Sequence, residues 1–143
     1  MKILVTGSTG FVGSNLCRAL VEAGHSVRAF HRPTSTLRML EGLDVEHALG
    51  DLNQVETLQT ALAGIEAVFH TAAYMSGKQP GKLYAVTVEG TRRLARAALE
   101  AGVRRFVHTS SVAALGVAEP GQMEPLDENH TWNYRPERYP YGY

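Results

Sequence analysis

The chain begins with Met1–Gly13, MKILVTGSTGFVG, and this stretch decides the fold. Its apolar run, Lys2–Thr6, is typical of a buried strand, and the residues from Phe11 onward carry the apolar spacing of a helix. Three glycines, at positions 7, 10 and 13, fill the junction. A glycine-rich turn at such a junction permits a tight bend and brings the free N–H groups of the helix start close to a phosphate. The stretch therefore predicts a nucleotide-binding turn in preference to a flexible surface turn.

Strand-like runs alternate with helical patterns along the rest of the chain. Further strands are expected at Val27–Phe30, Val45–Leu49, Ala67–Thr71 and Arg105–Thr109. Helices are expected at Phe11–Ala23, Thr34–Glu41, Val55–Leu62 and Leu83–Ala101. The alternation predicts a doubly wound α/β fold, with a parallel sheet of strand order 3-2-1-4-5 and helices on both faces. Because such sheets bind ligands beyond the carboxyl ends of their strands, the residues that follow each strand form the candidate site.

Three local details of these helices can be tested. The first helix is expected to pack through Val12, Leu16, Ala19, Leu20 and Ala23. Asn53 and Glu56 have the spacing of a capping box at the start of the third helix. The arginines at positions 92, 93 and 96 are expected on the solvated face of the last helix. Beyond residue 116, four prolines in a polar and aromatic segment predict a loop.

The composition excludes several function classes. Lysine and arginine together number 14, as do aspartate and glutamate, so no charge excess points to nucleic acid or an anionic membrane. The single cysteine, Cys17, rules out an intramolecular disulfide and fits a reducing compartment. The apolar stretch Ile3–Val5 is too short for a signal-peptide core or a membrane span. We therefore expect a cytoplasmic protein whose partners include neither nucleic acid nor a membrane.

The glycine spacing G-x-x-G-x-x-G, preceded by Thr6, resembles the TGxxGxxG fingerprint of the extended short-chain dehydrogenase/reductase family, the NAD(P)-dependent epimerases and dehydratases. The resemblance covers nearly the whole chain and implies that residues 1–143 are a Rossmann domain that binds NAD(P). It also implies that the turn holds the pyrophosphate part of the cofactor. The cofactor-binding residues of this turn are Gly7, Thr9, Gly10, Phe11 and Val12.

The end of the second strand indicates which dinucleotide is bound. NAD is usually held here by an acidic residue on the ribose 2′-hydroxyl, but no Asp or Glu lies between Glu22 and Glu41. An arginine in that place pairs instead with a 2′-phosphate, and Arg32 matches the position of an arginine in the family's NADP-dependent reductases. The alternative is that Arg32 is a solvated loop charge. We expect NADP as the cofactor, with NAD as the less favoured one.

Three further segments resemble family motifs that lie along the dinucleotide. The segment at 50–52 resembles the GDL motif beside the adenine, although Asp51 can equally serve the start of the following helix. The segment at 70–73 resembles the HxAA motif beside the nicotinamide half, and His70 itself is expected to be a hydrogen-bonded core residue. Thr87 stands where most members have the Asn of the NVxGT motif. The cofactor-binding residues implied are Asp51, Leu52, Thr71, Ala72, Ala73, Thr87 and Thr109.

The same residues favour one function within the family. The dihydroflavonol-reductase-like branch tolerates Thr87, and together with Arg32 this favours a reductase that moves hydride between NADP(H) and a small carbonyl or alcohol substrate. A sugar-nucleotide epimerase or dehydratase, in which the hydride returns to the substrate, is the first alternative. A regulator that senses dinucleotide without chemistry is the second. The resemblance also implies a homodimer, and no metal site is indicated.

The resemblance also implies catalytic residues near the end of the chain. The segment at 106–111 resembles the (F/V)xxSS motif, whose last serine, Ser111, would hold the reacting substrate oxygen. The family's acid/base group is the tyrosine of a YxxxK motif, and it needs the lysine because an unperturbed tyrosine has a pKa of about 10. Tyr141 is the best match, followed by Tyr139 and then Tyr143. Since the lysine would fall beyond residue 143, we expect a fragment of a longer enzyme, with little or no turnover of its own.

Overall fold

The computed structural model describes residues 1–74, 79–118, 121 and 123–133 of the chain. It divides into two compact units, Met1–Thr109 and Ser110–Tyr143. Within the described residues, all of the strands and all of the α-helices belong to the first unit. In this described part, no helix is both long enough and apolar enough to span a membrane.

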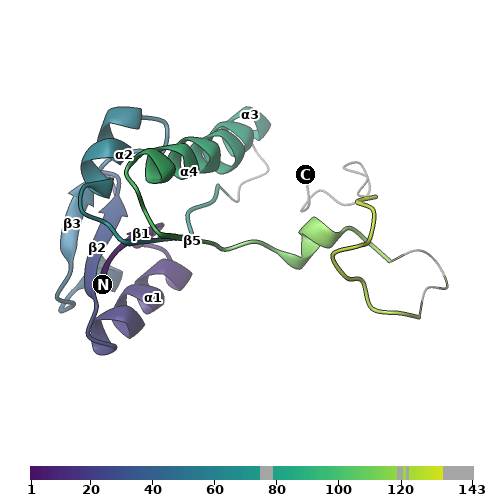
Figure 1. Ribbon diagram of the computed structural model, residues 1–143, viewed down its shortest axis with the longest axis horizontal. Coiled ribbons are helices and arrows are strands. Elements are labelled where there is room, and N and C mark those ends of the chain that lie inside the picture. The colour runs from purple at the N-terminus through teal and green to yellow at the C-terminus, as the bar shows by residue number, and fades with distance from the viewer. Residues whose placement is uncertain (75–78, 119–120, 122, 134–143) are drawn as a thin grey trace. The chain divides into compact units, whose positions relative to one another are not determined.

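A five-stranded parallel sheet forms the centre of the first unit (Figure 1). Its strands are β1 (Lys2–Thr6), β2 (Ser26–His31), β3 (Glu46–Leu49), β4 (Ala67–His70) and β5 (Arg105–His108). The order β3-β2-β1-β4-β5 confirms the doubly wound arrangement predicted from the sequence. Thr6 lies opposite both Phe30 and His70, so the three central strands end at the same edge of the sheet.

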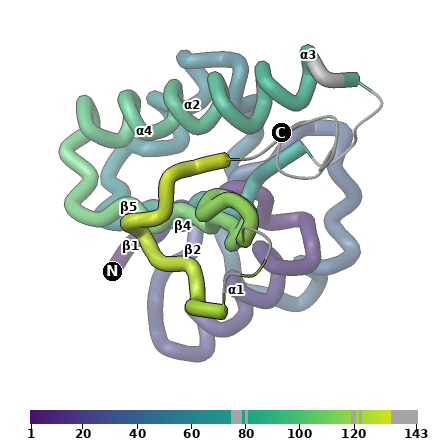
Figure 2. The backbone as a smooth tube through the Cα atoms, turned by 90° about the vertical axis from the view of Figure 1, so that its right-hand side faces the viewer, coloured from purple at the N-terminus to yellow at the C-terminus, as the bar shows by residue number. Residues whose placement is uncertain are grey.

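Helices cover both faces of the sheet. One face carries α1 (Phe11–Glu22), and the other carries α2 (Val55–Leu62) and α4 (Gly90–Glu100), as Figures 1 and 2 show. The short α3 (Pro80–Leu83) and the π-helical segment η2 (Tyr84–Glu89) precede α4. Right-handed crossovers explain this division, because the chain moves outward from β1 in one direction to reach β3 and then returns to build β4 and β5 on the other side.

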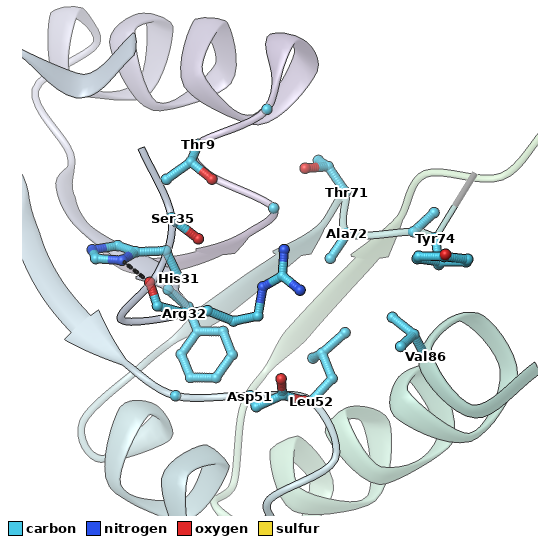
Figure 3. Close-up of a pocket in the computed structure, with 15 residues that line it drawn as sticks. Thr9, His31, Arg32, Ser35, Asp51, Leu52, Thr71, Ala72, Tyr74 and Val86 are labelled. Carbon is cyan, nitrogen blue, oxygen red and sulfur yellow. Dashed lines mark hydrogen bonds between the residues drawn. The ribbon is translucent and has the colours of Figure 1, made fainter. Parts of the chain in front are cut away.

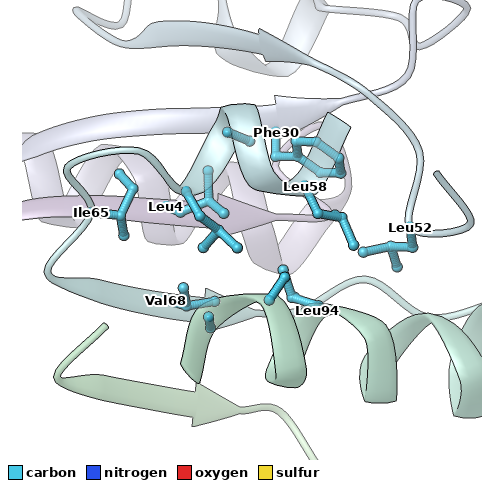
Figure 4. Close-up of a cluster of buried hydrophobic side chains, with 11 residues drawn as sticks. Leu4, Phe30, Leu52, Leu58, Ile65, Val68 and Leu94 are labelled. Atoms are coloured by element: carbon cyan, nitrogen blue, oxygen red, sulfur yellow. The ribbon is translucent and has the colours of Figure 1, made fainter. Parts of the chain in front are cut away.

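Each face of the sheet has its own hydrophobic core. The core beneath α2 and α4 consists of Leu4, Phe30, Leu52, Leu58, Ala61, Leu62, Ile65, Val68, Leu94, Ala97 and Ala98 (Figure 4). The core beneath α1 consists of Ile3, Val5, Cys17, Val27, Ala29, Leu40 and Ala67. Neighbouring residues of β1 therefore bury their side chains on opposite faces, which explains why Lys2–Thr6 is continuously apolar. Each fully buried leucine stabilises the fold by about 1.5–3 kcal/mol.

The predicted packing face of α1 is wrong in part. Val12 is 55% exposed, and Ala19 and Ala23 are exposed as well, whereas Gly13, Ser14 and Cys17 are the buried residues. The helix lies so close to the sheet that a Cβ on Gly13 would stand 2.2 Å from the carbonyl oxygen of Gly7. The face of α1 that lies closest to the sheet must therefore carry small residues. A prediction based on large apolar residues selects a different face of the helix.

Two expectations about short helices are also wrong. Within Thr34–Glu41 the structure has only a 3-10 turn, η1 (Arg38–Leu40), because Leu40 is the one buried apolar residue of that stretch. The capping box of Asn53 and Glu56 does not form, since the N-cap of α2 is Gln54 without a side-chain bond. The turn before α2 is instead held by a carboxylate, as the N–H of Asn53 donates to Oδ1 of Asp51 over 2.9 Å.

The long helix predicted at Leu83–Ala101 is present, but it begins earlier and is not regular. It starts with α3 and passes through η2 before it becomes α-helical at Gly90. A π-helical turn of this kind is rare and often lies at a functional site. Two of the three arginines expected on the solvated face, Arg92 and Arg96, are exposed, and Arg93 is partly buried beside Asn53, whose Oδ1 accepts a bond from Nη1.

The second unit contains little regular structure among its described residues. A 3-10 turn, η3 (Val112–Leu115), ends at Gly116, whose φ of 98° lies in the region that favours glycine. Asn133 then binds both backbone groups of Val117, accepting from its N–H and donating to its carbonyl at 2.9 Å each. In the described residues this agrees with the loop predicted beyond residue 116.

Candidate functional site

A pocket of about 300 Å³ lies at the carboxyl edge of the sheet, as expected for this topology (Figure 3). The segments after four of the five strands contribute to it. Its lining residues are Gly7, Thr9, Gly10, Phe30, His31, Arg32, Ser35, Gly50, Asp51, Leu52, Thr71, Ala72, Ala73, Tyr74 and Val86. The topology therefore gathers segments separated by dozens of residues into one concave site.

The glycine turn has the geometry of an anion cradle. Gly7 has a φ of 69°, and a Cβ there would lie 2.8 Å from the backbone nitrogen of Ala72. The N–H of Gly10 donates to the carbonyl of Gly7 over 2.9 Å, which closes the turn. Gly10 is also the N-cap of α1 and offers no side chain to its first turn. The N–H groups at the start of α1 are thus left for an anionic ligand, and the helix dipole favours negative charge there.

Two hydroxyls fix this turn against the sheet. The hydroxyl of Ser8 donates to the carbonyl of Phe30 over 3.0 Å, and that of Thr71 donates to the carbonyl of Thr6 over 2.7 Å. Ser8 is fully buried. Both bonds restrain the loop whose N–H groups face the pocket.

Arg32 lines the pocket and has no structural partner for its side chain among the described residues. Its guanidinium extends across the pocket, between Thr71 and Asp51 (Figure 3). The structure gives that guanidinium no hydrogen bond or ion pair within the described residues, whereas the Arg32 carbonyl accepts from the N–H of Ser35 over 3.0 Å. The turn from Arg32 to Ser35 therefore presents a free cation and a hydroxyl to the same corner of the pocket.

Asp51 serves the fold and lines the pocket at once. Its Oδ1 accepts from Asn53 N–H, and its backbone N–H donates to the Thr57 hydroxyl over 3.2 Å. Leu52 beside it is buried, and a Cβ on Gly90 would lie 3.0 Å from the Leu52 Cβ. The structural role that the sequence left open for Asp51 is therefore present, and the carboxylate still faces the pocket.

His70 is a buried, hydrogen-bonded residue, as predicted. Its Nδ1 lies 2.6 Å from Oγ1 of Thr6, and its Nε2 lies 2.8 Å from Oγ1 of Thr91. The Thr91 hydroxyl donates to the carbonyl of Thr87, so it must accept from Nε2–H of His70, and Nδ1 then accepts from Thr6. Burial, and secondarily the nearby His108, lower the pKa of His70 to about 4. The imidazole is thus neutral at physiological pH.

Thr87 continues this chain of contacts to the wall of the pocket. Its Oγ1 accepts from the backbone N–H of Tyr74 over 3.0 Å, and Tyr74 lines the pocket together with Val86. The chain from His70 through Thr91 to Thr87 and Tyr74 joins the interior of the sheet to η2 and to the loop after β4. The π-helical turn therefore holds a segment of the site in place.

The predicted site residues fall into three groups. Most of the predicted cofactor residues line the pocket, but Phe11, Val12, Thr87 and Thr109 are not among the lining residues. Ser111 belongs to the second unit, where its Oγ accepts from the N–H of Ala113 over 3.2 Å and caps η3. Tyr139, Tyr141 and Tyr143 lie outside the described residues.

Several lining residues were missed in the sequence, namely Phe30, His31, Ser35, Tyr74 and Val86. Phe30, His31 and Tyr74 end or follow a strand, so the rule that located Arg32 and Ala73 also covers them. Ser35 and Val86 carry no comparable signal, because they reach the pocket through a turn and through the π-helical segment. In the described part of the chain, no cluster of side chains suited to a metal ion is present.

The proteins to which this chain is similar agree with the geometry of the pocket. Residues 3–143 match the model of the NAD dependent epimerase/dehydratase family. The chain is 45% identical over 138 residues to the sterol demethylase protein B of Methylococcus capsulatus, covering 95% of this chain and 40% of that protein. It is also 45% identical over 120 residues to a putative dihydroflavonol 4-reductase of Synechocystis, covering 82% of this chain and 35% of that one.

Solved structures of proteins with bound NAD are also similar to this chain. A short-chain dehydrogenase/reductase superfamily protein from Agrobacterium tumefaciens with bound NAD superimposes with a TM-score of 0.80 at 39% identity, covering 99% of this chain and 41% of that one. A UDP-glucose-4-epimerase from Stenotrophomonas maltophila, with NAD and formylated UDP-arabinopyranose, gives 0.82 at 27% identity, covering 99% and 44%. The chain thus spans about two fifths of the length of the proteins it matches.

Proposed function

The chain belongs to the NAD-dependent epimerase/dehydratase family, and from this premise we propose that it binds NADP(H) in the pocket and that the whole protein is a carbonyl reductase. The residues present fit such a dinucleotide. The glycine turn leaves N–H groups for a pyrophosphate, and the small residues Thr71–Ala73 leave room beside the end of β4. The cofactor, when bound, supplies or accepts the hydride.

The observation that carries the choice of NADP over NAD is the free guanidinium of Arg32. Among the residues that line the pocket, Asp51 is the only carboxylate, and its Oδ1 is engaged by the N–H of Asn53. The corner at the end of β2 holds Arg32 and Ser35, which suit a 2′-phosphate and leave a ribose 2′-hydroxyl without an acidic acceptor. The NAD found in related structures belongs to those proteins, and this corner argues for the phosphorylated form here.

For the chemistry we propose Ser111 as the hydrogen-bond partner of the substrate oxygen and Tyr141 as the group that gives or takes its proton. Both assignments come from the motifs in the sequence. A small carbonyl or alcohol compound is the proposed substrate, because the reductase-like branch that the sequence resembles tolerates Thr87 and the family's NADP-dependent reductases carry an arginine at the Arg32 position. The putative dihydroflavonol 4-reductase among the relatives supports this branch.

A second candidate is a sugar-nucleotide epimerase or dehydratase. It is favoured by the fold match to a UDP-glucose-4-epimerase that binds a UDP-sugar. The two functions differ in stoichiometry, because a reductase consumes one NADPH for each product and an epimerase regenerates its cofactor. A dinucleotide sensor is distinguished by substitution, because it would keep its function when Ser111→Ala and Tyr141→Phe are introduced.

Equilibrium titration with NADPH and NADH tests the proposal. We expect tighter binding of NADPH, and we expect Arg32→Gln to weaken NADPH binding about ten- to hundredfold while NADH binding changes little, because a charge-assisted bond is lost. Arg38→Gln is the matched control, since Arg38 is exposed nearby on η1 and does not line the pocket. Equal affinities for both dinucleotides, or equal effects of the two substitutions, would contradict the preference for NADP.

A further inference from the structure

Two histidines form a hydrogen-bonded pair directly behind the Arg32 corner of the pocket. Nε2 of His31 lies 3.0 Å from Nδ1 of His47, and Nδ1 of His31 lies 3.1 Å from the carbonyl oxygen of Arg32. We propose that this pair is a proton-sensitive selectivity element, which strengthens binding of a 2′-phosphorylated dinucleotide as the pH falls. The inference rests on the proposed binding of NADP(H) in this pocket.

The pair is built by two neighbouring strands on one face of the sheet. His31 ends β2, and His47 lies on β3, whose register places it opposite Ala29. Ala29 belongs to the core beneath α1, and because side chains alternate along a strand, His31 and His47 share that face. The two rings meet edge to face, with centroids 5.2 Å apart and planes at 77°. His31 is 7% exposed and lines the pocket, whereas His47 is exposed on the outer strand.

The hydrogen bonds determine where each ring carries its proton. The Arg32 carbonyl can only accept, so Nδ1 of His31 must donate in the bond that a dashed line marks in Figure 3. In the neutral pair Nε2 of His31 then accepts, and Nδ1 of His47 donates. Nε2 of the exposed His47 takes part in neither of these bonds. A proton can therefore be added to His47 without breaking either bond, whereas a proton on both rings would set two N–H groups against each other.

The surrounding charges decide what favours that extra proton. On the elements next to the pair, the described charged residues are Arg18 and Glu22 on α1, Arg32, Arg38, Glu41 and Asp44 between β2 and β3, and Asp51 after β3. Glu46, beside His47 in sequence, lies on the opposite face and pairs with Lys2 and Arg28. Among the described residues no carboxylate forms an ion pair with either imidazole.

A 2′-phosphate would supply the missing negative charge. It would bring its charge to Arg32, whose backbone carbonyl is bonded to His31. The phosphate and the added proton attract each other, so each must favour the binding of the other by the same factor. NAD has no phosphate at this position and gains nothing from the proton. The preference for NADP over NAD is therefore expected to rise as the pH falls.

The test uses isothermal titration calorimetry with NADP⁺ and NAD⁺, both of which withstand mild acid, between about pH 8 and pH 5.5. In the unaltered chain we expect the ratio of the NAD⁺ to the NADP⁺ dissociation constant to rise with falling pH. In His47→Gln we expect about three- to tenfold less of that rise, because one screened charge near the phosphate is lost. His47 is exposed and outside the pocket lining, so the substitution spares the fold and the binding residues.

His25→Gln is the matched control, because His25 precedes β2 at the far edge of the sheet. The 2′-phosphate of the ligand gains and loses its own proton in the same way with His25→Gln and with His47→Gln. The difference in pH dependence between the two variants therefore isolates the contribution of the histidine pair. The same pH dependence in both variants, or a ratio that does not change with pH in the unaltered chain, overturns the inference while leaving the binding of NADP(H) intact. Failure to bind either dinucleotide at any pH overturns the proposed function instead.

Discussion

Nε2 of His70 and Oγ1 of Thr91 lie 2.8 Å apart, and this contact ties the end of a central strand to the helix that covers it. The Thr91 hydroxyl in turn donates to the carbonyl of Thr87, which lies in the π-helical segment beside the pocket. A helix this near the site is thus positioned by a neutral imidazole inside the sheet. The arrangement has consequences for stability and for binding that can be measured separately.

Stability should decrease in mild acid because of His70. Its pKa is lowered to about 4 in the folded chain and returns to about 6.5 on unfolding, so the unfolded chain takes up a proton in this range. The stabilisation is complete above about pH 6.5 and is lost as the pH falls toward 4. Between pH 7 and pH 5 we expect urea denaturation to show a loss of about 2 kcal/mol in the free energy of unfolding.

A His70→Gln variant should be less stable at neutral pH but should lose this pH dependence, because glutamine does not titrate. His25→Gln should keep it. Should the pH dependence persist unchanged in His70→Gln, another group would be responsible for it.

A substitution at Thr87 should weaken binding of the nicotinamide half of the dinucleotide only. Replacement by valine keeps the shape but removes the oxygen that accepts from Tyr74 N–H, so the loop after β4 should loosen. We expect NADPH to bind about tenfold more weakly, whereas adenosine 2′,5′-bisphosphate, which lacks the nicotinamide half, should bind as before. Thr87→Ser, which retains the hydroxyl, should be nearly normal. An equal loss for both ligands would indicate a general structural defect.

Gly13 should tolerate no side chain. A Cβ there would lie 2.2 Å from the Gly7 carbonyl, so Gly13→Ala must push α1 away from the strand. We expect a loss of about 3 kcal/mol in stability and no detectable dinucleotide binding. Gly81→Ala is the control, because its Cβ would meet nothing within 4 Å and alanine favours the helix. Thermal unfolding and NADPH titration of both variants measure the difference.

The sequence predicted those features that depend on patterns along the chain. Lys2–Thr6, the glycine turn and the alternation of strands and helices define the topology, because right-handed crossovers leave few arrangements for such a chain. Arg32 and Asp51 were found by the same logic, since each directly follows a strand. These expectations needed no knowledge of distant contacts.

The rest depends on which segments meet in space. Ser35 reaches the pocket only because Thr34–Glu41 turns instead of forming a helix, and nothing in its own sequence requires that turn. The close face of α1 is set by the Gly7–Gly13 contact rather than by the largest apolar side chains. The pairing of His31 with His47 joins two strands sixteen residues apart and follows only from the register of β2 and β3.

Residues 1–143 should bind the dinucleotide without turning it over. The last lysine of this sequence is Lys82, which lies over the ring of Tyr74 at 5.1 Å, and the family resemblance implies that the acid/base tyrosine needs a lysine four residues beyond Tyr141. Without that cation a tyrosine keeps a pKa of about 10 and is a poor proton carrier at neutral pH. We expect saturable NADPH binding but no loss of NADPH absorbance above the buffer rate with aldehydes and ketones. Turnover that persists in Tyr141→Phe would show that a different group carries the proton, and that group would replace Tyr141 in the mechanism.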